Sequence, residues 1–132
     1  MEKVTKILLI EDVLEDIRYA EIQFEIMFGN NFTMDVCDYF SKAIQLLQKK
    51  SFDIIILDLS LPDSKGLSSM KKLSDSYSIP IIIYTGLTDE LVKAEAMRNG
   101  AMDYLIKGKT ATNTLKASIV NSIIQYSTGH KK

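Results

Sequence analysis

The sequence predicts an α/β protein built on a parallel sheet, with helices covering both faces of that sheet. Three apolar runs of four residues, at 7–10, 54–57 and 81–84, are rich in isoleucine and end in polar or glycine-containing sequence. Runs of this kind are typical of strands that are buried on both faces. Strand and helix patterns alternate five times along the chain, which implies a parallel sheet with right-handed crossovers.

Weaker patterns supply the other elements. Residues 33–37 partly alternate between polar and apolar side chains and predict an edge strand, while residues 103–106 predict the fifth strand. Helical spacing of apolar residues, together with start and stop signals, predicts helices over about 14–28, from Ser41, over about 67–74, from Asp89, and from Thr112 or Asn113. Ser41 is also a residue type that can cap the helix it begins.

The same spacing predicts which helix residues face the core. We expect Met70 and Leu73 to point inward from the third helix, and Leu91, Ala94 and Met97 to do so from the fourth. An alternative stays open for the last two helices, where a few apolar residues could instead be exposed for a partner.

Composition and length indicate one ordinary globular domain. The chain has 132 residues and a net charge of −1, which argues against a nucleic-acid binder. No apolar run approaches the roughly 20 residues needed to cross a bilayer, and the N-terminus lacks a signal-peptide pattern. The single cysteine, Cys37, is expected to be a buried small residue, and His130 to belong to a solvated tail. We therefore expect a cytoplasmic protein without a membrane or nucleic-acid partner.

Polar side chains follow four of the predicted strands at the point where each strand ends. Glu11 and Asp12 follow the first apolar run, Asp58 the second, Thr85 the third, and Lys107 the last predicted strand. Sites in open α/β sheets form outside the carboxyl ends of the strands. A lone aspartate at a strand end is usually a solvated loop residue, but agreement among four strand ends predicts a site.

This group of residues suits phosphoryl transfer. Three converging carboxylates repel one another and would raise at least one pKa, unless a cation such as Mg²⁺ relieves the repulsion. A carboxylate can also act as a nucleophile and form an aspartyl phosphate. Such a transfer needs positive charge and hydrogen-bond donors around the phosphoryl oxygens, and Lys107 and Thr85 are suited to these roles.

From about Lys6 to about Gln125, the chain resembles the receiver domain of two-component response regulators. The resemblance is carried by the segments at 9–12 (LIED), 56–63 (ILDLSLPD), 84–86 (YTG) and 100–107 (GAMDYLIK), together with Gly66. It implies a (βα)5 flavodoxin-like fold with strand order 2-1-3-4-5. It also implies that residues 1–132 form a single receiver domain, with a core at about 6–126 and no output domain.

The resemblance assigns roles to individual residues. Asp58 is implied to accept a phosphoryl group from a sensor histidine kinase or a histidine phosphotransfer protein. Mg²⁺, for which Mn²⁺ can substitute, would be held by Asp12, by Asp58, by the backbone carbonyl of Ser60, and by Glu11 through water. Lys107 would pair with Asp58 and later with the phosphoryl group.

A switch pair and an output surface are also implied. Thr85 would move toward the phosphoryl group, and the ring of Tyr104 would turn from solvent into the space that Thr85 leaves. The face formed by helix 4, strand 5 and helix 5 would then dock a downstream protein or a second copy of the chain. On this interpretation the protein is a signalling phosphoacceptor and catalyses only its own phosphorylation and dephosphorylation.

Two positions depart from the family pattern. Gly108 stands where the family most often has a proline joined by a cis bond, so the sequence leaves the Lys107–Gly108 bond open as cis or trans and predicts a mobile loop. Glu11 stands where the first residue of the acidic pair is usually Asp. We interpret Asp16 and Asp63, which lie near the site in sequence, as ordinary helix-start and loop charges.

Three other classes of protein share single features with this sequence. A phosphatase of the haloacid dehalogenase type would need a second Asp two residues after Asp58, where this chain has Ser60. A receiver-like binding module that is not phosphorylated would normally lack Asp58, Lys107 or the acidic pair. A flavin carrier would place its phosphate loop after the first strand, whereas residues 85–88 follow the fourth.

Overall fold

A parallel sheet of five strands forms the middle layer of the protein, in the order β2-β1-β3-β6-β7. The computed structural model describes residues 3–129. The strands are β1 (Thr5–Ile10), β2 (Phe32–Cys37), β3 (Ile54–Leu57), β6 (Ile81–Thr85) and β7 (Asp103–Ile106). Counted along the chain, these five strands have the predicted order 2-1-3-4-5. The order reverses at β1, which has β2 on one side and β3 on the other.

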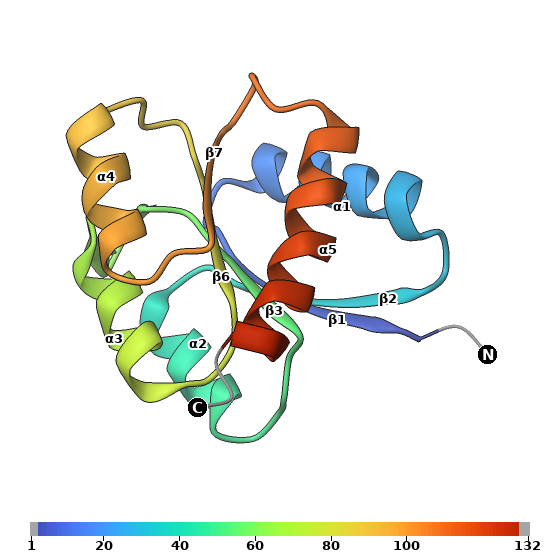
Figure 1. Cartoon of the computed structure of the whole chain (residues 1–132), viewed down its shortest axis with the longest axis horizontal. Helices are drawn as coiled ribbons and strands as arrows, with labels where there is room; N and C mark the ends of the chain where they lie inside the picture. The colour runs from blue at the N-terminus through green and yellow to red at the C-terminus, as the bar shows by residue number, and fades with distance from the viewer. Residues whose placement is uncertain (1–2, 130–132) are drawn as a thin grey trace.

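Helices cover both faces of the sheet (Figure 1). The helices α1 (Leu14–Phe28) and α5 (Thr112–Gly129) lie on one face, and α2 (Phe40–Leu47), α3 (Ser68–Ser76) and α4 (Glu90–Arg98) lie on the other. The predicted α/β class, the edge position of β2 and the five helices are therefore confirmed. In the part of the chain that the structure describes, no helix is both long enough and apolar enough to cross a membrane.

The central strands are apolar throughout because each side of the sheet has its own core. Leu8 and Ile10 pack in the core on the α2–α3 side, whereas Ile7 and Leu9 pack in the core beside Phe24 of α1. Successive side chains of a strand point to opposite faces, so a strand covered on both faces needs apolar residues at every position. Cys37, at the end of β2, is buried as expected.

Two helix starts test the predicted caps. Asp89 caps α4 as expected, since its carboxylate accepts hydrogen bonds from the backbone amides of Leu91 (2.8 Å) and Val92 (3.3 Å). The prediction that Ser41 caps α2 is wrong, because the helix already begins at Phe40. The carboxylate of Asp63, from a loop distant in sequence, accepts instead from the amides of Phe40 (2.7 Å) and Ser41 (3.1 Å). Asp63 is thus a tertiary cap rather than an ordinary loop charge.

The predicted inward face of α4 is also wrong. Leu91 is 81% exposed, and Ala94 and Met97 are exposed as well. The helix turns Ala96 and part of Val92 toward the core instead. Helix α4 packs against β7, at the edge of the sheet, and the core covers only a narrow stripe of this helix. In α3, Met70 and Leu73 are buried as predicted.

A short hairpin follows β3 that the sequence patterns did not predict. Strands β4 (Ser60–Leu61) and β5 (Ser64–Lys65) pair antiparallel around Pro62 and Asp63. The hairpin carries Asp63 to the start of α2 and ends at Gly66, whose φ of 69° favours glycine. The interpretation of His130 as part of a tail lies outside the described residues.

Candidate functional site

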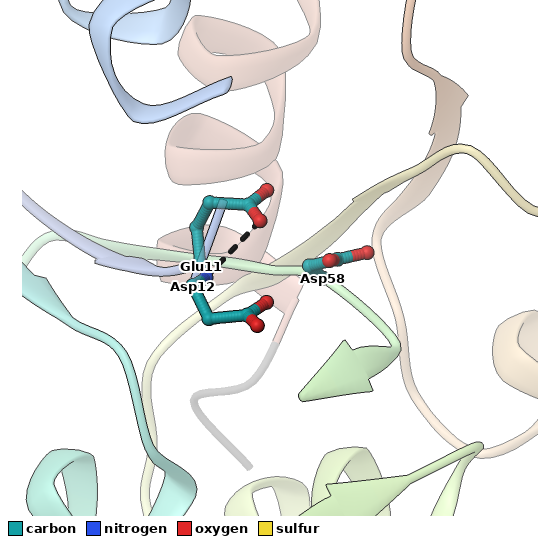
Figure 2. A group of neighbouring side chains, drawn as sticks. All are labelled: Glu11, Asp12 and Asp58. Atoms are coloured by element: carbon teal, nitrogen blue, oxygen red, sulfur yellow. Dashed lines mark hydrogen bonds between the residues drawn. The ribbon is translucent and has the colours of Figure 1, made fainter. Parts of the chain in front are cut away.

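Three carboxylates meet at the carboxyl ends of β1 and β3. Figure 2 shows Glu11 and Asp12 together at the end of β1, with Asp58 beside them at the end of β3. One oxygen from each of the three carboxylates lies within 4.8 Å of the others. The backbone at this edge is fixed, since the amide of Glu11 donates to the Cys37 carbonyl (2.9 Å) and the amide of Asp58 to the Ile10 carbonyl (3.0 Å). The three acidic residues therefore lie together, as the sequence predicts.

Glu11 is the buried member of the group. One of its oxygens accepts hydrogen bonds from the backbone amides of Asp12 and Val13, both at 3.1 Å, and the other forms an ion pair with Lys107. Burial raises the pKa of the Glu11 carboxyl, although the bonds from Lys107 and Val13 act in the opposite direction. Glu11 therefore holds the lysine and the chain after β1 in place.

Lys107 lies among three carboxylates. Its ammonium pairs with Glu11, with Asp16 Oδ2 at 2.8 Å and with Asp58 Oδ2 at 3.4 Å. Burial alone would lower the pKa of Lys107, but hydrogen bonds to Asp16 and Glu11 and the charge of Asp58 together raise it above its ordinary value. The predicted contact between Lys107 and Asp58 is present, and the ammonium is held charged.

Asp16 was missed as a residue of the site. It lies in the first turn of α1 and accepts a hydrogen bond from Lys107, across 91 residues of sequence. The interpretation of Asp16 as an ordinary helix-start charge is therefore incomplete. The sequence does contain one indication of this role. Asp16 lies in the first turn of the helix that follows Glu11 and Asp12, and this turn adjoins the edge of the sheet where the site lies.

The acidic group fits a hard divalent cation. Asp12 is exposed, and its carboxylate makes no hydrogen bond or ion pair with the rest of residues 3–129. Asp58 is buried, with Lys107 as its nearest cation. The three carboxylates of Glu11, Asp12 and Asp58 outnumber the single ammonium of Lys107, so the group carries an excess of negative charge. Carboxylate oxygens are also ligands that Mg²⁺ accepts.

Thr85 and Tyr104 are joined through the loop between β6 and α4. Thr85 is buried at the end of β6, and its hydroxyl oxygen accepts a hydrogen bond from the amide of Leu87 (3.4 Å). The Tyr104 hydroxyl donates to the carbonyl of Leu87 (2.8 Å). The expectation that the Tyr104 ring starts in solvent is wrong, because the ring is buried in the core on the α2–α3 side and its hydroxyl is held by the Leu87 carbonyl.

The turn after β7 settles the bond at Gly108. No peptide bond in residues 3–129 is cis, so the Lys107–Gly108 bond is trans. The amide of Lys109 donates to the Ile106 carbonyl (3.1 Å), and Gly108 has a φ of 79°, as the third residue of a type II turn requires. The Thr110 hydroxyl donates to the same carbonyl (2.8 Å). Glycine thus provides a conformation that proline cannot adopt.

Fold and site together define a flavodoxin-like α/β protein whose carboxylates and lysine lie at the switch point of a parallel sheet. The chain matches the response regulator receiver domain family over residues 7–119, and it belongs to that family. In this family the receiver is the phosphoacceptor module of two-component signalling. Membership favours a receiver over the phosphatase and flavin-carrier alternatives.

Relatives and solved structures agree with this assignment. The chain is 33% identical over 104 residues to the response regulator ArlR of Staphylococcus saprophyticus. This match covers 78% of the present chain and 46% of ArlR. The chain is also 31% identical over 102 residues to the regulatory protein VanR of Enterococcus faecium. This second match covers 77% of the present chain and 43% of VanR. The chain thus spans less than half the length of these relatives.

Among solved structures, a two-component response regulator from Clostridium difficile is similar, at 26% identity with a TM-score of 0.79. The match covers 92% of this chain and 96% of that one. A signal receiver domain of a diguanylate cyclase from Desulfovibrio desulfuricans is 25% identical with a TM-score of 0.82, and covers 96% of this chain and 99% of its own.

Proposed function

We propose that Asp58 is the phosphoacceptor, and that it takes a phosphoryl group from a phosphohistidine of a sensor histidine kinase or a histidine phosphotransfer protein. The observation that supports this assignment most directly is the placement of Asp58 between a cation and an acidic pair. Its Oδ2 lies 3.4 Å from the Lys107 ammonium, and its carboxylate lies within the same 4.8 Å group as Glu11 and Asp12.

The acidic group supports Mg²⁺ as the bound ion, for which Mn²⁺ would be able to substitute. Asp12, Asp58 and the backbone carbonyl of Ser60 would hold the ion, and Glu11 would act through water. When bound, the ion would neutralise charge on the phosphoryl oxygens and on the carboxylates around them. Asp12 supports this role because its carboxylate has no competing partner among residues 3–129.

The hairpin geometry supports the role of the Ser60 carbonyl. The amide of Gly66 donates to the Leu59 carbonyl (3.0 Å), and Ser60 opposes residue 65 in the next pair along the hairpin. Hydrogen-bonded and non-bonded pairs alternate in an antiparallel ladder, so the backbone groups of Ser60 point away from β5. This carbonyl is therefore not used by the hairpin and is available to a ligand.

The transfer itself needs little from the protein beyond position and charge. An Asp58 oxygen forms a bond to phosphorus while the bond from phosphorus to the imidazole nitrogen breaks, and the imidazole keeps the electron pair. Lys107 and the Thr85 hydroxyl would stabilise the negative oxygens of the phosphoryl group. The other steps that the chain would catalyse are those of its own dephosphorylation.

A phosphoryl group on Asp58 would change the output surface through Thr85. The Thr85 hydroxyl oxygen accepts a hydrogen bond from the Leu87 amide, and its O–H is a donor that would turn toward a phosphoryl oxygen. The change would pass to Tyr104 through Leu87, and from there to the face formed by α4, β7 and α5. We infer that this face docks a downstream partner or a second copy of the chain, and the exposure of Leu91 on α4 supports it.

We further propose that residues 1–132 form one receiver domain that works in the cytoplasm, without a membrane or nucleic-acid partner of its own. The net charge of −1 supports the last point, since nucleic-acid binders usually carry a clustered basic excess.

The test is phosphorylation by a small phosphodonor such as phosphoramidate with Mg²⁺, followed by intact mass spectrometry. Wild type should gain the mass of one phosphoryl group, and Asp58→Asn should gain none. Asp75→Asn is a matched control, because this aspartate is an exposed partner of Lys71 on α3, away from the site. If Asp58→Asn were still labelled while Asp75→Asn behaved as wild type, the acceptor would be another residue.

A further inference from the structure

The three carboxylate partners of Lys107 are not equivalent. The ammonium forms hydrogen bonds with Glu11 and Asp16, the latter at 2.8 Å, whereas its distance to Asp58 is 3.4 Å. Charge-assisted hydrogen bonds between ammonium and carboxylate are about 2.7–2.9 Å long, so the contact with Asp58 is an ion pair without a well-formed hydrogen bond. In this structure Lys107 is therefore held mainly by two residues that are not the proposed acceptor.

These carboxylates also differ in their access to water. The side chains of Glu11 and Asp58 are 3% and 5% exposed, whereas that of Asp16 is 39% exposed. A buried carboxylate that loses its cation is left without solvation, but a half-exposed one can be hydrated in exchange. Of the contacts that Lys107 makes, the one with Asp16 is therefore the easiest to break.

The space around this contact allows such an exchange. A cavity of about 240 Å³ adjoins Asp16 and Lys107 and is otherwise lined by Glu11, Gly108, Leu9, Tyr19, Ala20 and Tyr84. A cavity of this size, with Glu11, Asp16 and Lys107 in its lining, has room for water beside the Asp16 carboxylate. Lys107 can thus leave Asp16 without leaving an unsolvated charge behind.

We propose that Asp16 is a positioning residue that holds Lys107 back from Asp58 in the unphosphorylated protein, and that this ion pair breaks when Asp58 is phosphorylated. The inference rests on the proposed function of Asp58. A phosphoryl group brings added negative charge and three acceptor oxygens next to an ammonium that already lies 3.4 Å from Asp58. Breaking the pair would also release the turn after β7 from the first turn of α1.

The test compares the affinity of beryllofluoride, a phosphoryl mimic, for Asp16→Asn and for wild type, by NMR titration in the presence of Mg²⁺. Because Lys107 need no longer leave Asp16, the variant should bind about two- to fivefold more tightly, as the strength of a part-exposed ion pair predicts. Asp16→Glu keeps a carboxylate within reach of Lys107 and should stay close to wild type.

Glu15→Gln is the matched control. Glu15 is the neighbouring residue in the first turn of α1, is exposed, and makes no ion pair within residues 3–129. The Glu15→Gln substitution removes one negative charge, as Asp16→Asn does, from the same turn of α1, but it leaves the contacts of Lys107 unchanged. A second measurement needs no metal: the amide signals of Lys107 and Gly108 should move in the metal-free Asp16→Asn protein and stay in place in Glu15→Gln.

The outcomes separate this inference from the proposed function. Equal affinity gains in Asp16→Asn and Glu15→Gln would overturn the inference alone, because they would show a general charge effect. So would a structure of the beryllofluoride complex in which Lys107 and Asp16 still form their hydrogen bond. Failure of wild type to bind the mimic, or unchanged binding by Asp58→Asn, would overturn the proposed function and the inference together.

Discussion

Thr85 and Tyr104 hold the two backbone polar groups of the same residue. The amide of Leu87 donates to the Thr85 hydroxyl oxygen at 3.4 Å, and the carbonyl of Leu87 accepts from the Tyr104 hydroxyl at 2.8 Å. Leu87 lies in the loop that leads from the site to α4, so a shift of either side chain must act on this loop. A hydrogen-bonded path therefore runs from Thr85 through Leu87 to Tyr104 in this structure.

We predict that Tyr104→Phe loosens this loop without blocking phosphorylation. The variant keeps the buried ring but leaves the Leu87 carbonyl without its donor, which should cost about 1 kcal/mol of unfolding free energy. Urea denaturation measures the loss, and amide hydrogen exchange at residues 87–90 should become faster. Tyr39→Phe, on an exposed ring at the start of α2, should change neither quantity.

Thr85→Ala tests the other end of the path. The variant retains Asp58 and Lys107, so it should still be phosphorylated, but it lacks the hydroxyl that would donate to the phosphoryl group. With beryllofluoride and Mg²⁺, the NMR shift changes at residues 85–90 and 104–107 should be large in wild type and small in the variant. Large changes in both proteins would show that the signal leaves the site by another route.

Gly108→Pro should impair folding. Gly108 has a φ of 79°, whereas the proline ring fixes φ near −65°, so the turn after β7 cannot form around proline. Gly108→Ala should be milder and cost about 1–2 kcal/mol, as expected for a left-handed conformation with a side chain. Thermal unfolding measures both. Gly129→Ala, at the end of α5, has no left-handed φ and should leave the melting temperature unchanged.

The exposure of α4 gives a prediction about the output surface. Leu91 is 81% exposed, so Leu91→Ser should change the unfolding free energy by less than about 0.5 kcal/mol. If the α4–β7–α5 face binds a second copy, the variant should weaken the self-association of the beryllofluoride-bound protein in analytical ultracentrifugation. Ile26→Ser, which removes another exposed apolar side chain on the outer surface of α1, is the matched control and should have no effect.

The sheet could be predicted closely because its strands are buried on both faces. The predicted strands at 54–57 and 103–106 have the bounds that the structure shows, and α1 spans the predicted 14–28. The face of α4 could not be predicted in the same way. Spacing identifies an apolar stripe, but only the packing of α4 against the edge strand β7 decides that Ala96 rather than Leu91 is buried.

At the site, too, some residues could be placed from the sequence and others could not. Glu11, Asp58 and Lys107 could be placed together from sequence because the carboxyl ends of neighbouring parallel strands share one edge. The contact of Asp16 with Lys107 depends on how the first turn of α1 is oriented above that edge. The inward position of Tyr104 depends on the path of the loop that supplies its acceptor. Neither orientation is encoded in the residue type.

Loss of Lys107 should reveal how firmly Glu11 is buried. Lys107→Met leaves the Glu11 carboxylate, whose side chain is 3% exposed, without its cation, and should cost about 3 kcal/mol of unfolding free energy at pH 7. Burial already raises the pKa of Glu11 in the folded protein, and removing Lys107, which lowers that pKa, should raise it further. Urea denaturation of the metal-free proteins at pH 7 and pH 5 measures the difference.

The sign of the pH dependence follows from proton uptake. Between the unfolded and the raised folded pKa of Glu11, the folded variant binds more protons than the unfolded chain, so its stability increases as the pH falls through this window. The stability gap between Lys107→Met and wild type should therefore narrow from pH 7 to pH 5. Adding Glu11→Gln to Lys107→Met removes the titrating group, and the double variant should lose this pH-dependent recovery. A gap that stayed constant in the single variant would mean that Glu11 is solvated once Lys107 is gone.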